Sequence, residues 1–510
     1  MPFPRRSGVL LHPTSLPGPY GLGELGPHAV RWLDWLAASG QSLWQVLPLG
    51  PTGFGDSPYQ SFSSFAGNPF MISLERLRHE GWLDADDLAG ADFGSGRVDF
   101  GPVIEFRMRA LTRAADTWHA RADTGERAAF AAFCERSASW LDDFALFMAL
   151  KEAHGGQSWA DWAPPLRRRQ AKALAAAREA HAGAIDRQRL WQWWFDVHWS
   201  EIRAQAAERG IAVMGDVPIF VAYDSADTWA DQDLFHLDDE GRPAVIAGVP
   251  PDYFSATGQR WGNPLYRWNR HAKRGYAWWV ARVRRTLELV DVLRIDHFRG
   301  FEAYWEIPAD EPTAVKGRWV KGAGQPLFDA LRAALGDLPI VAEDLGVITA
   351  AVERLRDDNG LPGMKVLQFA FAADASDPYL PHNFPANAVV YTGTHDNDTT
   401  CGWYAKAPER ERDLVRRYLA CDGSRVAWDL WRLAQASVAD TAIAPLQDLL
   451  GLGSGGRMNT PGAPSGNWGW RFEWEHVPYR LDPQLREMAE LFGRLPSAGA
   501  VDTSYRQSTT

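Results

Sequence analysis

The chain has 510 residues, of which 46% are hydrophobic and 23% charged, and its formal net charge is -11 at pH 7. This composition is that of a folded protein, and its acidic balance argues against a nucleic acid or another polyanion as partner. The widely spaced cysteines Cys134, Cys401 and Cys421 indicate neither a disulfide framework nor a zinc site. We therefore expect a cytoplasmic protein with a neutral or small-molecule ligand.

Eight short apolar runs are typical of buried parallel strands, and each continues into polar or glycine-rich residues. In chain order they are GVLL (8–11), SLWQVLPL (42–49), IAVMGDVPIF (211–220), VDVLRID (290–296), PIVAED (339–344), MKVLQFAF (364–371), AVVYTGTHD (388–396) and TAIAPLQD (441–448). Alanine-rich or amphipathic stretches, such as residues 28–39, lie between most of them and are typical of helices. The alternation predicts an α/β protein with one (β/α)8 TIM barrel over residues 1–500.

Two intervals are too long for simple crossovers between strands. Residues 70–209 separate the second and third runs and have a largely helical pattern, which predicts an inserted helical subdomain. Residues 221–285 separate the third and fourth runs and include VPPDYFSATGQRWGNPLY (249–266), where proline, glycine and aromatic residues predict a long ordered surface loop. The first residues lack the apolar core of a signal peptide, and no run is long enough to span a membrane. We expect residues 501–510 to form a disordered tail.

The fourth run ends in an unusual group of charges, in the stretch LELVDVLRIDHFRGF (287–301). Side chains two positions apart in a strand share a face, so Arg294 and Asp296 should lie side by side. The cation would keep the carboxyl ionised, as a nucleophile requires, but a purely structural ion pair has the same pattern.

Further carboxylates end other runs: Asp216, Glu343 and Asp396, the last preceded by His395. An aspartate after a strand is often only a helix cap. In a TIM barrel, however, the carboxyl ends of all strands meet at one rim, where active sites are built. Clustered acids at that rim suit glycosidic chemistry, in which one ionised acid attacks or stabilises the anomeric carbon and another protonates the leaving oxygen.

Six motifs together make the chain resemble the 4-α-glucanotransferase family, also called amylomaltase or disproportionating enzyme, a relative of the α-amylases. They are GPTGFGDSPYQSFSSFAGNP, GDVPIFVAYDSADTW, PPDYFSATGQRWGNPLY, VLRIDHFRGF, IVAEDLG and YTGTHDNDT, and the resemblance spans the chain from Leu10 to about Trp470. It implies a retaining transfer of α-1,4-glucan segments between maltooligosaccharides or to glucose, in maltodextrin, starch or glycogen metabolism. We expect a monomer or weak homodimer.

The resemblance assigns roles residue by residue. It makes Asp296 the nucleophile, Glu343 the general acid and base, and Asp396 the group that holds the 2- and 3-hydroxyls of the sugar. Residues that resemble the substrate-binding positions of the family are Tyr59, Asp216, Tyr253, Phe254, Trp261, Arg294, His395, Arg457, Asn459 and Asn467. Tyr253, Phe254 and Trp261 would belong to a glucan-binding loop over the cleft.

Four other interpretations compete with this resemblance. GLGSGG (451–456) matches a dinucleotide-binding turn, but Pro461 and Pro464 would break the helix that must follow. The His-Asp-Asn-Asp run at 395–398 lacks a second histidine at a ligand spacing, so we expect no metal and no other cofactor. An α-amylase-type hydrolase would use the same three carboxylates, and only the aromatic loop argues against it. A silent glucan-binding protein would suit the 25 tryptophans but would not need an acid, a base and a flanked nucleophile.

Overall fold

The computed structural model describes residues 4–251, 255–463 and 465–496. Eight parallel strands close into a barrel and pair in chain order, with the last strand beside the first. They are β1 (Arg6–Leu10), β2 (Leu43–Gln45), β3 (Ala212–Pro218), β6 (Val292–Asp296), β9 (Ile340–Ala342), β10 (Gly363–Val366), β11 (Ala388–Tyr391) and β12 (Thr441–Pro445). Each of the eight apolar runs overlaps one of these strands, so the predicted barrel is confirmed. The predicted tail, 501–510, lies outside the described residues.

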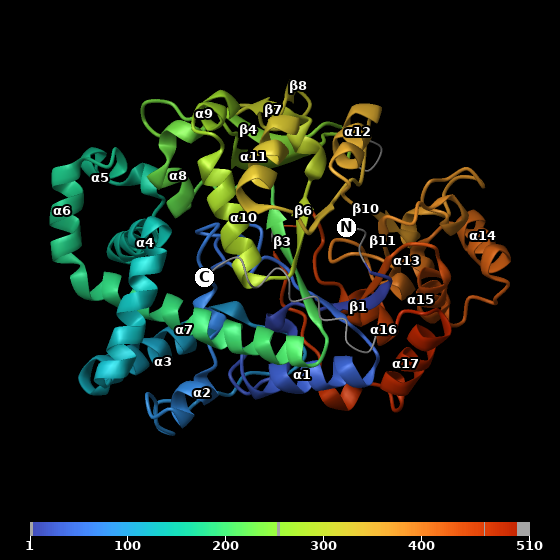
Figure 1. The fold of residues 1–510 in the computed structure, drawn as a ribbon, viewed down its shortest axis with the longest axis horizontal. Coiled ribbons are helices and arrows are strands. Elements are labelled where there is room, and N and C mark those ends of the chain that lie inside the picture. The colour runs from blue at the N-terminus through green and yellow to red at the C-terminus, as the bar shows by residue number, and fades with distance from the viewer. Residues whose placement is uncertain (1–3, 252–254, 464, 497–510) are drawn as a thin grey trace.

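Helices cover the outside of the barrel (Figure 1). Those that follow or precede barrel strands are α1 (Pro27–Ala38), α10 (Ala277–Leu289), α11 (Gln325–Leu335), α12 (Ala350–Asp358), α13 (Thr400–Lys406), α14 (Glu409–Leu419), α15 (Val426–Ala436), α16 (Leu446–Leu449) and α17 (Leu481–Leu491). One buried apolar cluster contains residues of all eight barrel strands, among them Met214 and Val292, so it fills the barrel interior. None of the described helices is both long and apolar enough to cross a membrane.

Between β2 and β3 the chain forms α2 (Leu74–His79), α3 (Phe100–Arg121), α4 (Thr124–Ala153), α5 (Pro164–Arg167), α6 (Ala171–Ala180) and α7 (Ala182–Glu208). Asp123 and Glu126 form a reciprocal capping box at the start of α4, which explains where that helix begins. Trp191, Trp194 and Trp199 of α7 are buried. In Figure 1, α4, α5 and α6 extend to one side of the barrel.

Part of the segment for which the sequence predicted a surface loop belongs to a second sheet. Its antiparallel strands lie in the order β5 (Gln259–Pro264), β4 (Val245–Val249), β7 (Ala303–Pro308) and β8 (Arg318–Lys321), and α8 (Ala226–Ala230) and α9 (Trp268–Lys273) flank the first two in the chain. The prediction for residues 249–266 was therefore wrong over β5. QRWGNP has no apolar alternation, and its pairing with β4 supplies the order that local propensity lacks.

The tight approach of β4 and β5 depends on Gly258. Its φ is +66°, and a Cβ there would lie 2.4 Å from the carbonyl oxygen of Val249. Only glycine fits such a left-handed position without strain. We expect the four-stranded sheet, which lies above the barrel in Figure 1, to hold Trp261 at one edge of the site.

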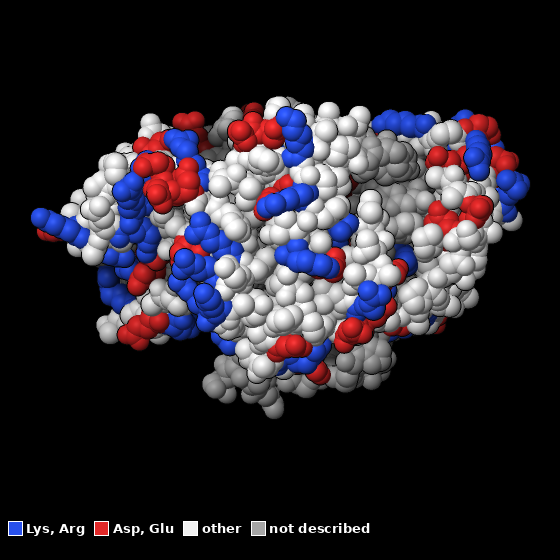
Figure 2. All heavy atoms as spheres, turned by 90° about the horizontal axis from the view of Figure 1, so that it is seen from above, with Lys and Arg blue, Asp and Glu red and all other residues white. Residues whose placement is uncertain are grey.

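Charged residues of both signs are interspersed on the face seen in Figure 2, with basic side chains densest toward the end that carries α5 and α6. In and just after α5, Arg167 and Arg168 pair with Glu240, and Arg169 pairs with Asp143. Paired charges do not create the extended positive field that a polyanion would require.

Candidate active site

The polar layer of the site follows from the alternation of side chains along β3 and β6. Met214 and Val292 are part of the apolar cluster inside the barrel. Asp216 and Arg294 stand two positions later on the same faces and pair with each other across the two strands. Asp296 is the last residue of β6. The barrel interior therefore changes from apolar to charged toward the carboxyl ends of its strands.

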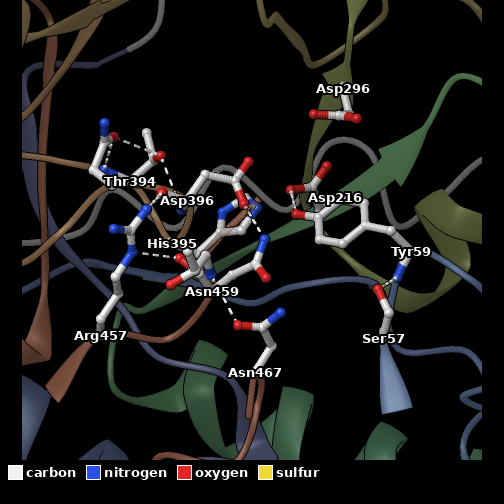
Figure 3. A network of polar contacts seen from close by, with 12 residues as sticks. Ser57, Tyr59, Asp216, Asp296, Thr394, His395, Asp396, Arg457, Asn459 and Asn467 are labelled. Atoms are coloured by element: carbon white, nitrogen blue, oxygen red, sulfur yellow. Dashed lines mark hydrogen bonds and ion pairs between the residues drawn. The ribbon is translucent and has the colours of Figure 1, made fainter. Parts of the chain in front are cut away.

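Arg294 links two of the predicted carboxylates. Its Nη1 donates to Asp216 Oδ2 at 2.6 Å and its Nη2 donates to Asp296 Oδ1 at 3.0 Å. Tyr59 Oη also donates to Asp216 Oδ2, at 2.8 Å (Figure 3). The exposed fraction is 0% for the Asp216 side chain but 28% for that of Asp296. Asp216 is therefore a buried partner that holds Arg294, and Asp296 is the carboxylate of the two that a ligand can reach.

The electrostatics of Arg294 keep it charged. Burial by itself lowers the pKa of Arg294, but the carboxylates of Asp216 and Asp296 outweigh this and raise its pKa well above the usual range. A permanent cation is thus fixed between the two acids.

Asp296 and Glu343 differ in the pKa that the site gives them. Burial raises the pKa of Asp296 to about 6, although the Arg294 cation opposes this rise. Burial, together with the negative charge of Asp296, raises the pKa of Glu343 to about 8. Near pH 7 the first group is mainly ionised and the second mainly protonated. The arrangement can therefore supply a carboxylate nucleophile and a carboxylic acid side by side.

Glu343 directly follows β9 and is held by main-chain donors. Its Oε1 accepts from the N–H of Leu345 at 2.8 Å, and its Oε2 accepts from the N–H of His297 at 2.7 Å. His297 follows Asp296 and has φ 51° and ψ 47°, a left-handed conformation that is uncommon outside glycine. This turn ties the loop after the Asp296 strand to the Glu343 side chain.

Asp396 lies in a separate polar group after β11. Its Oδ1 accepts from Asn459 Nδ2 at 2.6 Å and lies 3.4 Å from His395 Nε2. Arg457 Nη2 donates to the Asp396 carbonyl oxygen at 2.6 Å and so fixes the main chain (Figure 3). The Asp396 side chain remains 45% exposed. It is oriented yet accessible, as a group that binds sugar hydroxyls must be.

An aromatic stack joins the two polar groups. The ring of Tyr59 stacks on His395 with centroids 5.1 Å apart and an interplanar angle of 12°. Trp468 packs against both rings, with ring centroids 5.7 Å from Tyr59 and 6.1 Å from His395.

The side chain of Asn467 accepts from the N–H of Thr460 and donates to the Ala463 carbonyl, so its hydrogen bonds close its own loop.

Trp261 is the described member of the predicted glucan-binding loop. It lies on β5, its Nε1 donates to Gln259 Oε1 at 3.1 Å, and its ring meets the His297 imidazole edge-on at 4.8 Å. Trp261 therefore adjoins the turn that binds Glu343. Tyr253 and Phe254 lie outside the described residues.

Two contributors were not assigned from the sequence. His297 acts through its main-chain N–H, for which a sequence carries no signal beyond its place after Asp296. Trp468 directly follows Asn467 in the sequence, but only the folded chain brings it to Tyr59 and His395.

Comparisons with known proteins agree with this geometry. The family model described as 4-alpha-glucanotransferase matches residues 11–476. The 4-alpha-glucanotransferase of Thermus thermophilus is 54% identical, covering 97% of this chain and 100% of its own. The chloroplastic/amyloplastic 4-alpha-glucanotransferase of Solanum tuberosum is 45% identical over 96% of this chain and 87% of its own. The solved amylomaltase of Streptococcus agalactiae in complex with acarbose superposes with a TM-score of 0.93 at 38% identity, covering 96% of this chain and 99% of that one.

Proposed function

The chain belongs to the 4-alpha-glucanotransferase, or amylomaltase, family, and on that basis we propose that it moves segments of α-1,4-glucans between maltooligosaccharides and onto glucose. The activity is 4-α-glucanotransfer, and the close relatives carry that name over nearly the full length of the chain. A cytoplasmic location and a monomeric or weakly dimeric state stay predictions from the sequence.

The observation that carries the mechanism is the unequal pair of carboxyl groups. Arg294 bridges Asp216 and Asp296, and the pKa of Glu343, about 8, lies above that of Asp296, about 6. Ionised Asp296 attacks the anomeric carbon while protonated Glu343 gives its proton to the departing glycosidic oxygen. The C–O bond breaks, and a covalent glucosyl-enzyme forms at Asp296.

The second half of the reaction reverses these roles. Glu343, now ionised, takes the proton of an acceptor 4-hydroxyl, whose oxygen attacks the anomeric carbon and displaces Asp296. Two inversions restore the original anomeric configuration. Asp396, held by Asn459 and beside His395, is placed to hold sugar hydroxyls more tightly as the ring approaches the transition state.

Incubation with maltotriose tests this function. A transferase converts it into glucose and a ladder of longer maltooligosaccharides, which chromatography resolves. An α-amylase-type hydrolase would yield shorter products alone, and that outcome would overturn the proposal. The Asp296→Asn variant, prepared in parallel, controls for contaminating enzymes.

The pKa pair predicts a bell-shaped pH profile. Activity should rise as pH passes about 6, because Asp296 then loses its proton, and fall as pH passes about 8, because Glu343 then loses the proton it must donate. The two limbs belong to the coupled pair rather than to single residues. The measurement is kcat/KM for maltotriose from pH 4.5 to 9.5, with a check that the protein stays folded at both ends of this pH range. A flat profile across this range would contradict the acid and base assignment.

Trp261 is the residue at which transfer and hydrolysis should diverge. An aromatic face beside the glucosyl-enzyme stacks an acceptor sugar and excludes water, and such stacking is worth roughly 1 kcal/mol. We expect Trp261→Ala to lower maltotriose disproportionation about fivefold, the equivalent of that energy, and to raise the fraction of reducing ends released by hydrolysis. Glucose, total reducing ends and melting temperature are measured on one preparation. If both rates fall together with the melting temperature, Trp261 only packs the loop.

A further inference from the structure

The second sheet presents an aromatic side chain that the proposed mechanism does not use. Trp319 lies on β8, an edge strand of the sheet, and remains 41% exposed. Trp305 of the neighbouring strand β7 packs edge-on against it, with ring centroids 5.2 Å apart and an interplanar angle of 70°. The indole N–H of Trp305 is itself fixed to the Ala314 carbonyl at 2.9 Å. Trp319 is therefore supported from within the sheet although it faces solvent.

Arg299 fixes the ring of Trp319 to the active-site segments. The guanidinium carbon of Arg299 lies 3.8 Å from the centroid of the Trp319 ring, and its Nη1 donates to the Val347 carbonyl at 2.5 Å. Arg299 belongs to the turn that follows Asp296, and Val347 belongs to the loop that follows Glu343. The Trp319 surface, which we define as Trp319, Lys321 and Val347, is thus a continuation of the two segments that carry the reacting carboxyl groups.

Polar groups border this ring. Lys321 stands two positions after Trp319 on the same side of β8 and forms an ion pair with Glu302, while its own side chain is 82% exposed. Val347 is 61% exposed. Arg299 covers one face of the Trp319 ring, and the residue is 41% exposed. The exposed part of the ring suits the C–H face of a sugar, and the neighbouring charged groups suit its hydroxyls. The charge of Lys321 is neutralised by Glu302, and the Arg299 cation lies against the ring.

We propose that the Trp319 surface is an accessory site for α-1,4-glucan, which binds the part of a long chain that extends beyond the catalytic cleft. The choice of ligand rests on the proposed function. The contacts of Arg299 place Trp319 beside the loops that follow Asp296 and Glu343, so the surface adjoins the segments that carry the reacting carboxyl groups. The ring is already ordered by Arg299 and Trp305, so binding a sugar costs little side-chain entropy. Short substrates that end within the cleft gain nothing from this surface.

The test compares long and short substrates in Trp319→Ala, Trp319→Phe and the matched control Tyr479→Ala. Tyr479 is 92% exposed and lies two residues before the start of α17, a helix far from β8 in Figure 1. For each variant the ratio of KM for amylose to KM for maltotriose is measured, together with the melting temperature. Loss of the stacking platform should raise this ratio roughly three- to tenfold in Trp319→Ala, with Trp319→Phe in between and Tyr479→Ala like the wild type.

Affinity electrophoresis in gels that contain amylose gives a readout independent of turnover, and retardation should weaken for Trp319→Ala but not for Tyr479→Ala. An unchanged KM ratio with unchanged retardation would overturn the proposal. So would an equal loss on both substrates with a lower melting temperature, because Trp319 would then be structural. Loss of self-association in Trp319→Ala, with amylose binding intact, would instead assign this face to a second copy. If the wild type fails to disproportionate maltotriose, the proposed function fails, and the gels still test the surface.

Discussion

Asp296→Asn should reduce maltotriose disproportionation by roughly 10⁴-fold or more, the scale on which loss of a covalent nucleophile acts. The amide keeps the shape of the carboxylate, and its oxygen can still accept the hydrogen bond that Arg294 Nη2 gives to Oδ1. It carries no charge, however, and is a poor nucleophile. Binding of maltooligosaccharides should survive, which calorimetry with maltoheptaose would measure beside the initial rates.

Asp344→Asn is a matched control for this substitution. Asp344 is buried, whereas Asp296 is partly exposed, and it accepts the Met364 N–H at 2.7 Å and pairs with Arg356, so its role is structural. The control should lower the melting temperature while retaining most of kcat. More than a few per cent of wild-type activity in Asp296→Asn, with deamidation excluded by mass spectrometry, would show that another residue attacks the sugar.

The barrel could be predicted from the sequence because its strands are fully buried. A strand that is covered on both faces reads as a continuous apolar run, and β9 and β11 are such runs, while β3 and β6 are interrupted only by Gly215 and by the charged residues Asp216, Arg294 and Asp296. The polar residues that end these runs were then bound to meet at one rim, whatever the lengths of the insertions. This reasoning found Asp216, Asp296 and Glu343 without any knowledge of the contacts between them.

The second sheet and the finer site contacts could not be predicted in this way. Strand β5 has a glycine, a proline and no alternation, so its conformation comes from its pairing with β4 rather than from its own sequence. Asn459 reaches Asp396 across 63 positions of the chain. Contacts of that kind depend on how the loops are packed, and neither spacing nor residue type encodes them.

The balance of charge effects on Asp296 also differs from the simple argument of a neighbouring cation. Arg294 does lower the pKa of Asp296, but burial is the larger effect, and the pKa ends at about 6 rather than below the usual range. The sequence shows the cation but not the depth of burial. Burial also raises the pKa of Glu343, to about 8, so the pKa of the general acid lies above that of the nucleophile, as the mechanism requires.

Glu343→Gln should lower maltotriose turnover by roughly 10³- to 10⁴-fold, because the leaving oxygen loses its proton donor. Release of fluoride from α-glucosyl fluoride should fall far less, since fluoride departs without a proton. The release should then stall after one equivalent until azide, which needs no general base, attacks the glucosyl-enzyme. Both Glu343 oxygens accept main-chain N–H groups, so in the variant the amide nitrogen of glutamine must face one of these donors. The melting temperature is measured to separate the resulting loss of stability from the loss of catalysis. Asp296→Asn is the control, and neither α-glucosyl fluoride as substrate nor added azide should restore its turnover. Equal losses of turnover on maltotriose and on α-glucosyl fluoride would show that Glu343 is not the acid, because cleavage of α-glucosyl fluoride does not need a proton donor.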